Sequence, residues 1–333
     1  MPEEAVDLES SMRRAAEILS NADEVAIACH VNPDADALGS MLGLASVLRA
    51  RGARTVCSFG NEPPTLPRWA SLLPGSDRVV APSRFPAEPA VMVTCDCASF
   101  DRLAGLGASA TAATELIWID HHRSNDGYGT VRLVDPDASS TCEMVVRLLD
   151  AMGVEPDREA AICLYAGLVT DTGRFQYQAT TPETLRIAAR LREHDFDHAA
   201  LVRAMYEDND PSYLRLLGTA LGRMAEVPEA SVVWTYLTQA DLAAAGVTAG
   251  DTDDLIDVLR TARDVDVAAV LKQQRDGRFK VSVRSRGGHD LAAVAAVFGG
   301  GGHRLAAGYT SEHGPEGTIE RLVAALQQAP VAS

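Results

Sequence analysis

Six side chains that commonly bind metal ions stand directly after, or at the end of, apolar segments in the first half of the sequence. They are, in chain order, His30, Asp34, Asp36, Asp96, His121 and Asp171. Carboxylate oxygens combined with imidazole nitrogens suit Mn²⁺ best, and they also accept Mg²⁺, Co²⁺ or Fe²⁺. A single aspartate after a strand is usually a turn residue or a helix N-cap. The prediction of a metal centre therefore depends on the whole set and not on any one member.

The charges of this set indicate how many cations it would need. Four of the six residues are aspartates, and in one cleft their repulsion would keep some of them protonated. Two divalent ions would neutralise four carboxylates, with the two histidines as neutral nitrogen ligands. A carboxylate shared by the ions would hold them about 3.5–4 Å apart, the spacing of two-metal phosphoester hydrolysis. Water between the ions would lose a proton near neutral pH and become the nucleophile.

The segments around these residues predict the elements that position them. Strands are expected at 24–29, 53–58, 90–95 and 115–119, and helices at 36–51 and within 139–191. Strands that alternate with helices favour an α/β fold with a doubly wound, mostly parallel sheet. Ligands of such sheets bind at the carboxyl ends of the strands, where the six side chains would meet.

The second half of the chain predicts a separate, smaller α/β domain with a mixed sheet. Its expected strands are 231–237, 265–272 and 279–284, and its expected helices are 252–263, 290–298 and 315–328. A charge-rich segment precedes it. We therefore place the domain with the metal-type residues at 1–191, a connection at 192–215 and the second domain at 216–333.

Two arginines in the second domain are candidates for phosphate binding. If the strand expected from residue 279 continues to residue 286, Arg284 and Arg286 lie two residues apart on it and would share one face, with Ser285 opposite. Two guanidinium groups on one face suit a terminal phosphate. Positive charge also protects an exposed strand edge from association, so the pattern alone leaves both interpretations open.

A run of four glycines between two apolar segments of this domain indicates a close approach of the backbone to another group. It is followed by His303 and reads FGGGGH from residue 298. Free amides at Gly300, Gly301 and Gly302 can hold a phosphate, and His303 can stack on a base or pair with a phosphate.

Composition limits the possible partners. The 333 residues contain 30 Lys and Arg against 46 Asp and Glu, a formal charge of −16. Proteins that grip long nucleic acid normally carry a basic surface, so a nucleotide substrate is expected to be short. The sequence has no apolar run that could span a bilayer and no secretory leader in its first residues, so no membrane partner is expected. Six cysteines without framework spacing favour the cytoplasm.

Six motifs, in this order, resemble those of the DHH phosphoesterase family and its DHH-associated second domain. They are HVNPDADALGS (30–40), TCDCAS (94–99), IDHHRSN (119–125), TDTGRF (170–175), VSVRSRGGHD (281–290) and FGGGGHRLAAG (298–308). The resemblance covers nearly the whole chain. Ala35 departs from the glycine of many members, but it would touch no ligand.

The resemblance implies a role for each matched residue. One ion would be held by His30, Asp34 and Asp96. The second would be held by Asp36, Asp96, His121 and Asp171, so that Asp96 bridges the two. His122 would contact the scissile phosphate or help to protonate the leaving group, and Asp120 would orient a histidine.

The resemblance also implies an activity. Soluble two-domain members of this size degrade very short RNA and linear dinucleotides such as pApA from an end, and they remove the 3′-phosphate of pAp. Some act on cyclic di-AMP, which leaves a cyclic di-AMP phosphodiesterase as an alternative. An inorganic pyrophosphatase or polyphosphatase is less consistent with the second domain, and a nucleotide-binding regulatory module is the alternative without catalysis. A homodimer is compatible with the resemblance.

Overall fold

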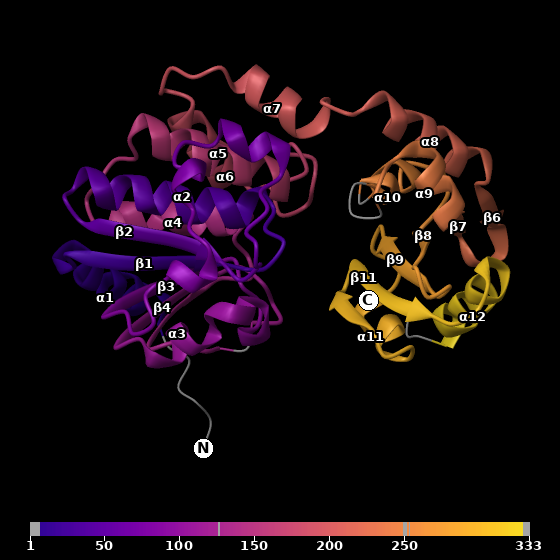
Figure 1. The fold of residues 1–333 in the computed structure, drawn as a ribbon, viewed down its shortest axis with the longest axis horizontal. Coiled ribbons are helices and arrows are strands. Elements are labelled where there is room, and N and C mark those ends of the chain that lie inside the picture. Colours follow the sequence, from indigo (N-terminus) through magenta and orange to yellow (C-terminus); the bar gives the residue numbers. More distant parts are fainter. Residues whose placement is uncertain (1–6, 126, 249–251, 253, 329–333) are drawn as a thin grey trace. The chain divides into compact units, whose positions relative to one another are not determined.

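The chain forms two compact units, residues 1–208 and 209–333. The computed structural model describes residues 7–125, 127–248, 252 and 254–328 (Figure 1). The segment 192–215, predicted as a connection, contains helix α7 (His198–Tyr206) and the first turn of α8 (Pro211–Gly222). Within the described parts of the chain, no helix has both the length and the apolar character that a bilayer crossing requires.

The first unit is built on a parallel sheet of five strands in the order β2-β1-β3-β4-β5. Its strands are β1 (Glu24–Cys29), β2 (Arg54–Phe59), β3 (Val91–Cys95), β4 (Glu115–Asp120) and β5 (Val131–Val134). From β1 the chain continues to β2 on one side and later to β3 on the other. The connection therefore reverses direction between β1 and β3, and doubly wound sheets bind ligands at such a reversal.

Helices cover both faces of this sheet (Figure 1). They are α1 (Leu8–Asn21), α2 (Ala35–Ala50), α3 (Gly107–Ala112), α4 (Thr141–Ala151) and α5 (Arg158–Asp171), and short 3₁₀ segments include η4 (Phe100–Leu106). Helices α6 (Pro182–Leu191) and α7 pack on α5. Alternate strand residues point to opposite faces. Val25 and Ile27 of β1 pack with α2, α4 and α5, whereas Ala26 and Ala28 pack with Leu103 of η4 and its neighbours.

The second unit has a mixed sheet of six strands in the order β10-β11-β9-β8-β7-β6. The strands are β6 (Ala225–Val227), β7 (Val232–Leu237), β8 (Val267–Gln273), β9 (Phe279–Ser285), β10 (Gly301–His303) and β11 (Ala306–Ser311). Strands β7 and β8 pair in parallel, and the other neighbours pair antiparallel.

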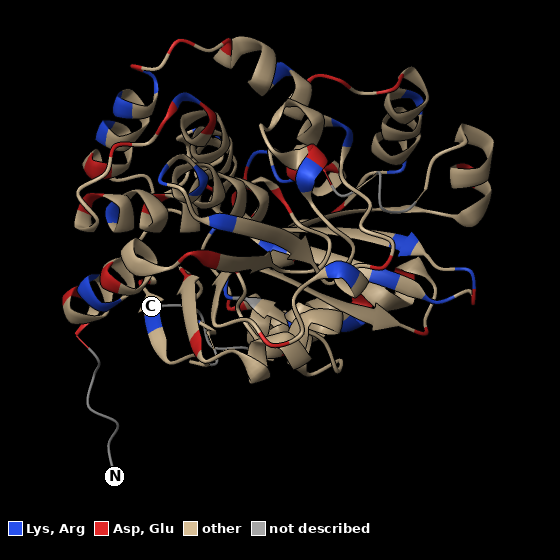
Figure 2. Cartoon of the chain, turned by 60° about the vertical axis from the view of Figure 1, so that its left-hand side comes forward, with Lys and Arg blue, Asp and Glu red and all other residues tan. Residues whose placement is uncertain are grey.

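Helices lie on both faces of the second sheet as well. They are α8, α9 (Gln239–Ala245), α10 (Leu255–Leu259), α11 (Leu291–Ala296) and α12 (Pro315–Gln328). Val267 and Leu271 of β8 pack towards α11 and α12, and Ala268 and Val270 pack towards α8, α9 and α10. Acidic and basic positions are interspersed along the elements of both units (Figure 2).

The predicted fold class, a doubly wound parallel sheet followed by a smaller α/β unit with a mixed sheet, is confirmed. The helix expected at 252–263 is shorter than predicted, because α10 spans only Leu255–Leu259, and residues 249–251 and 253 of this region lie outside the described part. Strands β5, β6 and β11 were not predicted, and neither was β10. It begins inside the glycine run, where periodicity carries no signal because glycine has no side chain to alternate.

Candidate metal centre

The metal-type residues of the first unit lie where its central strands end. His30 follows the last residue of β1, Asp96 follows the last residue of β3, and Asp120 ends β4. These three strands are neighbours in the sheet. The sheet order thus brings together residues that are up to 90 positions apart in the sequence.

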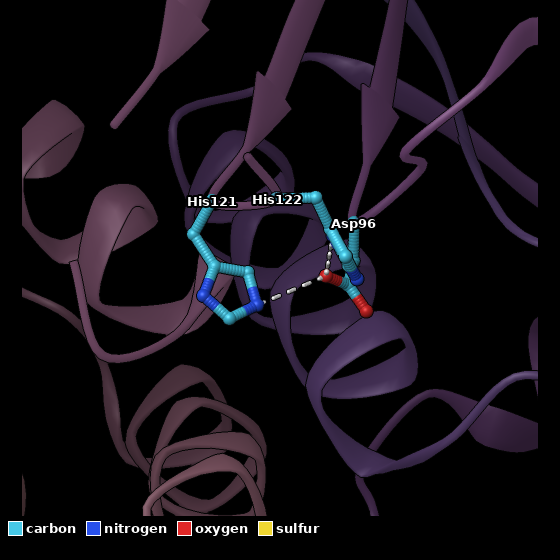
Figure 3. A group of neighbouring side chains, drawn as sticks. All are labelled: Asp96, His121 and His122. Carbon is cyan, nitrogen blue, oxygen red and sulfur yellow. Dashed lines mark ion pairs between the residues drawn. The ribbon is translucent and has the colours of Figure 1, made fainter. Parts of the chain in front are cut away.

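Asp96 lies at the middle of the cluster. Its backbone has φ 56°, a left-handed conformation that is costly for aspartate, and its amide donates to the carbonyl of Ile119 at 2.9 Å. One carboxylate oxygen lies 3.7 Å from His121 Nε2 and 3.6 Å from His122 Nδ1 (Figure 3). The other lies 3.4 Å from His30 Nε2. The strained backbone therefore turns this carboxylate between histidines from two strands.

Three groups of side chains in the described residues have the proximity that a metal ion requires. They are His30 with Asp34 and Asp96, Asp36 with His121 and Asp171, and Asp96 with His121 and His122. Every ligand predicted from the sequence belongs to at least one group. Asp96 and His121 each belong to two, so the groups are joined into one cluster.

Asp34 is the N-cap of α2, but this role uses only one of its two carboxylate oxygens. Asp34 Oδ1 accepts from the amides of Asp36 and Ala37 at 3.0 Å and so caps α2. Asp34 Oδ2 lies 3.8 Å from His30 Nε2. One side chain thus starts the helix and also takes part in the cluster.

The N-terminus of α4 holds two carboxylates of the cluster, which the sequence did not predict. The amides of Thr141 and Cys142 donate to Asp36 at 2.6 and 2.9 Å, and the Thr141 hydroxyl donates to Asp96 at 2.9 Å. A helix N-terminus attracts negative charge. The side chain of Ser140 caps α4, and a serine is a common sign of a helix start. It does not indicate which carboxylates the helix N-terminus contacts.

Burial and neighbouring charges shift the pKa values of the aspartates in the cluster. Burial raises the pKa of Asp36 well above its usual value, and the nearby Asp171 and Asp96 raise it further. Burial raises the pKa of Asp171 to about 6, although its hydrogen bond with His121 opposes this. Burial also acts to raise the pKa of Asp96, but the adjacent His30 outweighs it and holds that pKa below its usual range.

Burial has the opposite effect on the histidines, but their pKa values are also raised. Burial acts to lower the pKa of His121, but the carboxylates of Asp171, Asp36 and Asp96 outweigh it and raise that pKa to about 11. The pKa of His30 is also raised, against the effect of its burial, mainly by its bond to Asp96. The raised pKa values therefore favour protonated, positively charged histidines beside the buried carboxylates. Buried carboxylates with imidazole nitrogens form a donor set that fits divalent cations.

Backbone carbonyls and a carboxylate orient the histidine rings. His121 Nδ1 lies 3.3 Å from the carbonyl of Ala138, which leaves Nε2 towards the carboxylates. His122 Nδ1 lies 2.7 Å from Asp120 Oδ1, and Asn125 Nδ2 donates to the other Asp120 oxygen at 2.6 Å. Such partners fix the tautomer of a histidine at metal sites.

Arg102 of η4 is a cation at the cluster that sequence reasoning missed. Its Nη2 lies 2.6 Å from His30 Nδ1, which is also 2.8 Å from the carbonyl of Val31. A carbonyl only accepts and a guanidinium only donates, so Nδ1 can bond to one of them at a time. In the sequence, Arg102 is marked only by its place six residues after Asp96, and no helix or strand period connects the two positions.

The arginines predicted to share a strand face are arranged differently. Arg284 lies on β9, partly exposed, on the face opposite to the buried Ser285. Arg286 lies beyond the end of β9, and its Nη2 donates to the carbonyl of Arg260 at 2.7 Å. The Ser285 hydroxyl is 3.1 Å from both oxygens of Asp266, so it has a partner inside the unit.

The glycine run approaches the backbone of its own unit at two positions. A Cβ at Gly300 would lie 2.2 Å from the carbonyl oxygen of Gly308, and one at Gly302 would lie 2.5 Å from that of Ala306. The Gly300 amide donates to the carbonyl of Ala295, so it is not free. Gly301 borders open space. His303 closes β10, and its backbone pairs with Ala306.

Comparisons with known proteins agree with this architecture. Residues 24–168 match the DHH family, N-terminal domain, and residues 230–330 match the DHHA1 domain. The bifunctional oligoribonuclease and PAP phosphatase NrnA of Thermus thermophilus is 36% identical over 300 residues, 90% of this chain and 88% of that protein. The probable bifunctional oligoribonuclease and PAP phosphatase NrnA of Streptococcus mutans is 33% identical over 290 residues, 87% and 90% of the two chains.

A solved structure extends the similarity to the fold of the whole chain. An exopolyphosphatase-related protein from Bacteroides fragilis matches with a TM-score of 0.90 and 26% sequence identity, and the match covers 98% of each chain. The chain therefore belongs to the DHH family.

Proposed function

We propose that the chain is a two-metal phosphoesterase of short nucleotides. It would hydrolyse short oligoribonucleotides and linear dinucleotides such as pApA from an end, and it would remove the 3′-phosphate of pAp. Membership of the DHH family makes it a metal-dependent hydrolase of phosphoester bonds. The observation that carries the two-metal proposal is the position of Asp96. It forms one ligand group with His30 and Asp34, and it lies 3.7 Å from His121, a member of the group with Asp36 and Asp171. The oligoribonuclease and PAP phosphatase relatives support the choice of substrates.

The proposed ligand sets follow the geometric groups. One ion would be bound by His30, Asp34 and Asp96, the first group. The other would be bound by Asp36, His121 and Asp171, the second group, with Asp96 as a further ligand. Mn²⁺ is the preferred ion for this donor set. Bound divalent ions supply Lewis-acid activation of water and neutralise charge on the phosphate.

The protein side chains around the ions have separate tasks in the proposal. His122, held by Asp120 at 2.7 Å, donates a proton to the leaving oxygen. Thr141 holds the Asp96 carboxylate in place through its hydroxyl. When His30 Nδ1 donates to Val31, the guanidinium of Arg102 has no acceptor on that ring, and it is then available to bind the scissile phosphate.

The second unit would recognise the end of the substrate. Arg284 is a partly exposed cation on β9, and Arg286 follows the end of that strand. Gly301, which borders open space, is the position of the glycine run where a ligand can approach the backbone. The elements that support this surface would include Gly300, Gly302, Ser285 and His303. Local cations in a chain with a net charge of −16 favour short substrates over long nucleic acid.

Hydrolysis in the presence of Mn²⁺ tests the proposal, with pAp, pApA, a long single-stranded RNA, cyclic di-AMP and pyrophosphate at matched concentrations. Release of AMP from pApA and of phosphate from pAp, with little action on the long RNA, is the expected result. Faster turnover of cyclic di-AMP than of pApA would favour the phosphodiesterase alternative. Turnover of pyrophosphate alone would contradict the proposed substrates. Binding of nucleotides without any hydrolysis would indicate a regulatory module.

We also propose a cytoplasmic location and a homodimer. All six cysteines are free thiols, which persist in a reducing compartment. The dimer follows from the family resemblance and is measured by light scattering after gel filtration.

A further inference from the structure

One carboxylate in the second unit organises the loop that follows β9. Asp266, just before β8, accepts from the Ser285 hydroxyl at 3.1 Å and from the amides of Arg286 and Gly288 at 3.1 and 3.0 Å. It also bonds to His289 Nδ1 at 2.7 Å. Four residues of one short loop therefore converge on a single side chain.

The loop is shaped to fit this carboxylate. A Cβ at Gly288 would lie 2.8 Å from Asp266 Oδ2 and 2.9 Å from Cγ, closer than a side chain allows. Although its burial acts to raise it, the bonds from His289, Gly288 and Ser285 lower the pKa of Asp266. The carboxylate is therefore charged at neutral pH.

The same loop is attached to the turn between β10 and β11. The amide of Ser285 donates to the carbonyl of Leu305 at 2.9 Å, and the amide of Leu291 donates to that of Arg304 at 2.7 Å. Arg284, which precedes the loop, pairs with Ala306. The Asp266 loop, the end of the glycine run and Arg284 thus lie at one end of the sheet.

We infer that His289, oriented by Asp266, binds the terminal phosphate of the substrate through Nε2. The inference rests on the proposed function, because it concerns the substrate that the second unit would recognise. The His289 side chain is 19% exposed. Its Nδ1 is bonded to Asp266, and no described residue bonds to Nε2. A ring that carries both protons donates to a carboxylate through one nitrogen and to a phosphate through the other.

Asp266 acts in this account as a positioning residue. It fixes the rotation of the imidazole ring, and it places the backbone of the loop beside Arg284. Loss of a carboxylate that only stabilised the loop would affect every substrate equally. A carboxylate that positions a phosphate-binding ring affects only substrates with a terminal phosphate.

The test compares the Mn²⁺-dependent hydrolysis of two substrates, pApA and ApA, by the full chain. These two substrates differ only in the 5′-phosphate. In His289→Ala, KM for pApA should rise roughly tenfold, the loss of one charge-assisted hydrogen bond. KM for ApA and turnover of an aryl phosphate diester should stay within about twofold of wild type. Asp266→Asn should shift the same ratio by a smaller factor, because Asn still accepts one hydrogen bond.

Two control variants separate binding from folding. His313→Ala removes an exposed histidine of the same unit and should change neither KM. Gly288→Ala displaces the Asp266 carboxylate without removing any polar group, and it should reproduce the pApA defect. Gly218→Ala, where the new methyl meets open space, is its matched control.

Equal KM changes for pApA and ApA in His289→Ala, or none, would overturn the inference while leaving the proposed function intact. If the wild-type chain cleaved the aryl ester but neither dinucleotide, the proposed function would fail first, and the inference would fail with it.

Discussion

The two units use their chemically suggestive residues in different ways. In the first, four aspartates and two histidines converge, and burial, together with the nearby carboxylates of Asp171 and Asp96, raises the pKa of Asp36. In the second, Ser285 and two of the glycines are already engaged by their own unit, through Asp266 and β11. A cluster of mutually repelling charges therefore indicates a ligand more strongly than glycines or hydroxyls do. Glycines and hydroxyls can be required by packing and hydrogen bonding within the protein itself.

Replacement of the shared carboxylate should have the largest effect. Asp96→Asn removes charge from both ligand groups, and loss of several kcal/mol of transition-state stabilisation lowers kcat by about 1000-fold. Steady-state kinetics on pApA with Mn²⁺ measures this. Asp276→Asn, at an exposed turn of the second unit, serves as the control. If the activity of Asp96→Asn stayed within tenfold of wild type, the charged cluster of the first unit would no longer indicate a ligand more strongly than the residues of the second unit.

Loss of the hydroxyl behind Asp96 should have the next largest effect. Thr141→Val keeps the shape of the side chain but removes the donor at 2.9 Å, and metal affinity should fall by about 10–100-fold, as for other outer partners of metal ligands. Titration calorimetry with Mn²⁺ gives the dissociation constants. Thr219→Val, whose hydroxyl bonds only to its own helix, should bind metal as wild type does. Unchanged metal affinity in Thr141→Val would mean that the Thr141 hydroxyl does not hold Asp96 for metal binding and that the residue only forms part of helix α4.

The glycine run offers a direct test of packing against recognition. Gly300→Ala places a methyl 2.2 Å from a backbone oxygen, and it should lower the free energy of unfolding of the second unit by about 1–3 kcal/mol. Gly301→Ala meets open space and should be near neutral for stability. Urea denaturation compares them. Equal destabilisation would mean that the run is packed throughout and that none of it is available for a ligand.

The arginines should have a selective effect on substrate. In Arg284→Ala combined with Arg286→Ala, KM for pApA should rise by about tenfold or more, because charge-assisted bonds to a phosphate are lost. An aryl phosphate diester, which has no terminal nucleotide, should be hydrolysed almost as before. Kinetics on both substrates decides the matter. A matching loss on the ester would indicate that the second unit affects the metal centre and does not select the substrate.

The sequence predicted the fold class and the residues of the acidic cluster because their signals are local. Each strand end is marked by an apolar run followed by a charged residue, and Asp34 is marked both as a cap and as a cluster member. Thr141 was not predicted, because its contact with Asp96 spans 45 positions. Asp266 and His289 are 23 positions apart, and neither side chain is unusual in its own segment. Such pairs depend on strand order, which periodicity does not encode.

Asp96 is proposed to join two ion sites at the edge of the first sheet. The most direct measurement is the number of Mn²⁺ ions bound per chain at equilibrium, in wild type and in Asp96→Asn, with Asp276→Asn as the control. The account predicts two ions per chain in wild type and the control, and weakened binding of both ions in Asp96→Asn. One ion per wild-type chain, or two ions bound undiminished by Asp96→Asn, would contradict it.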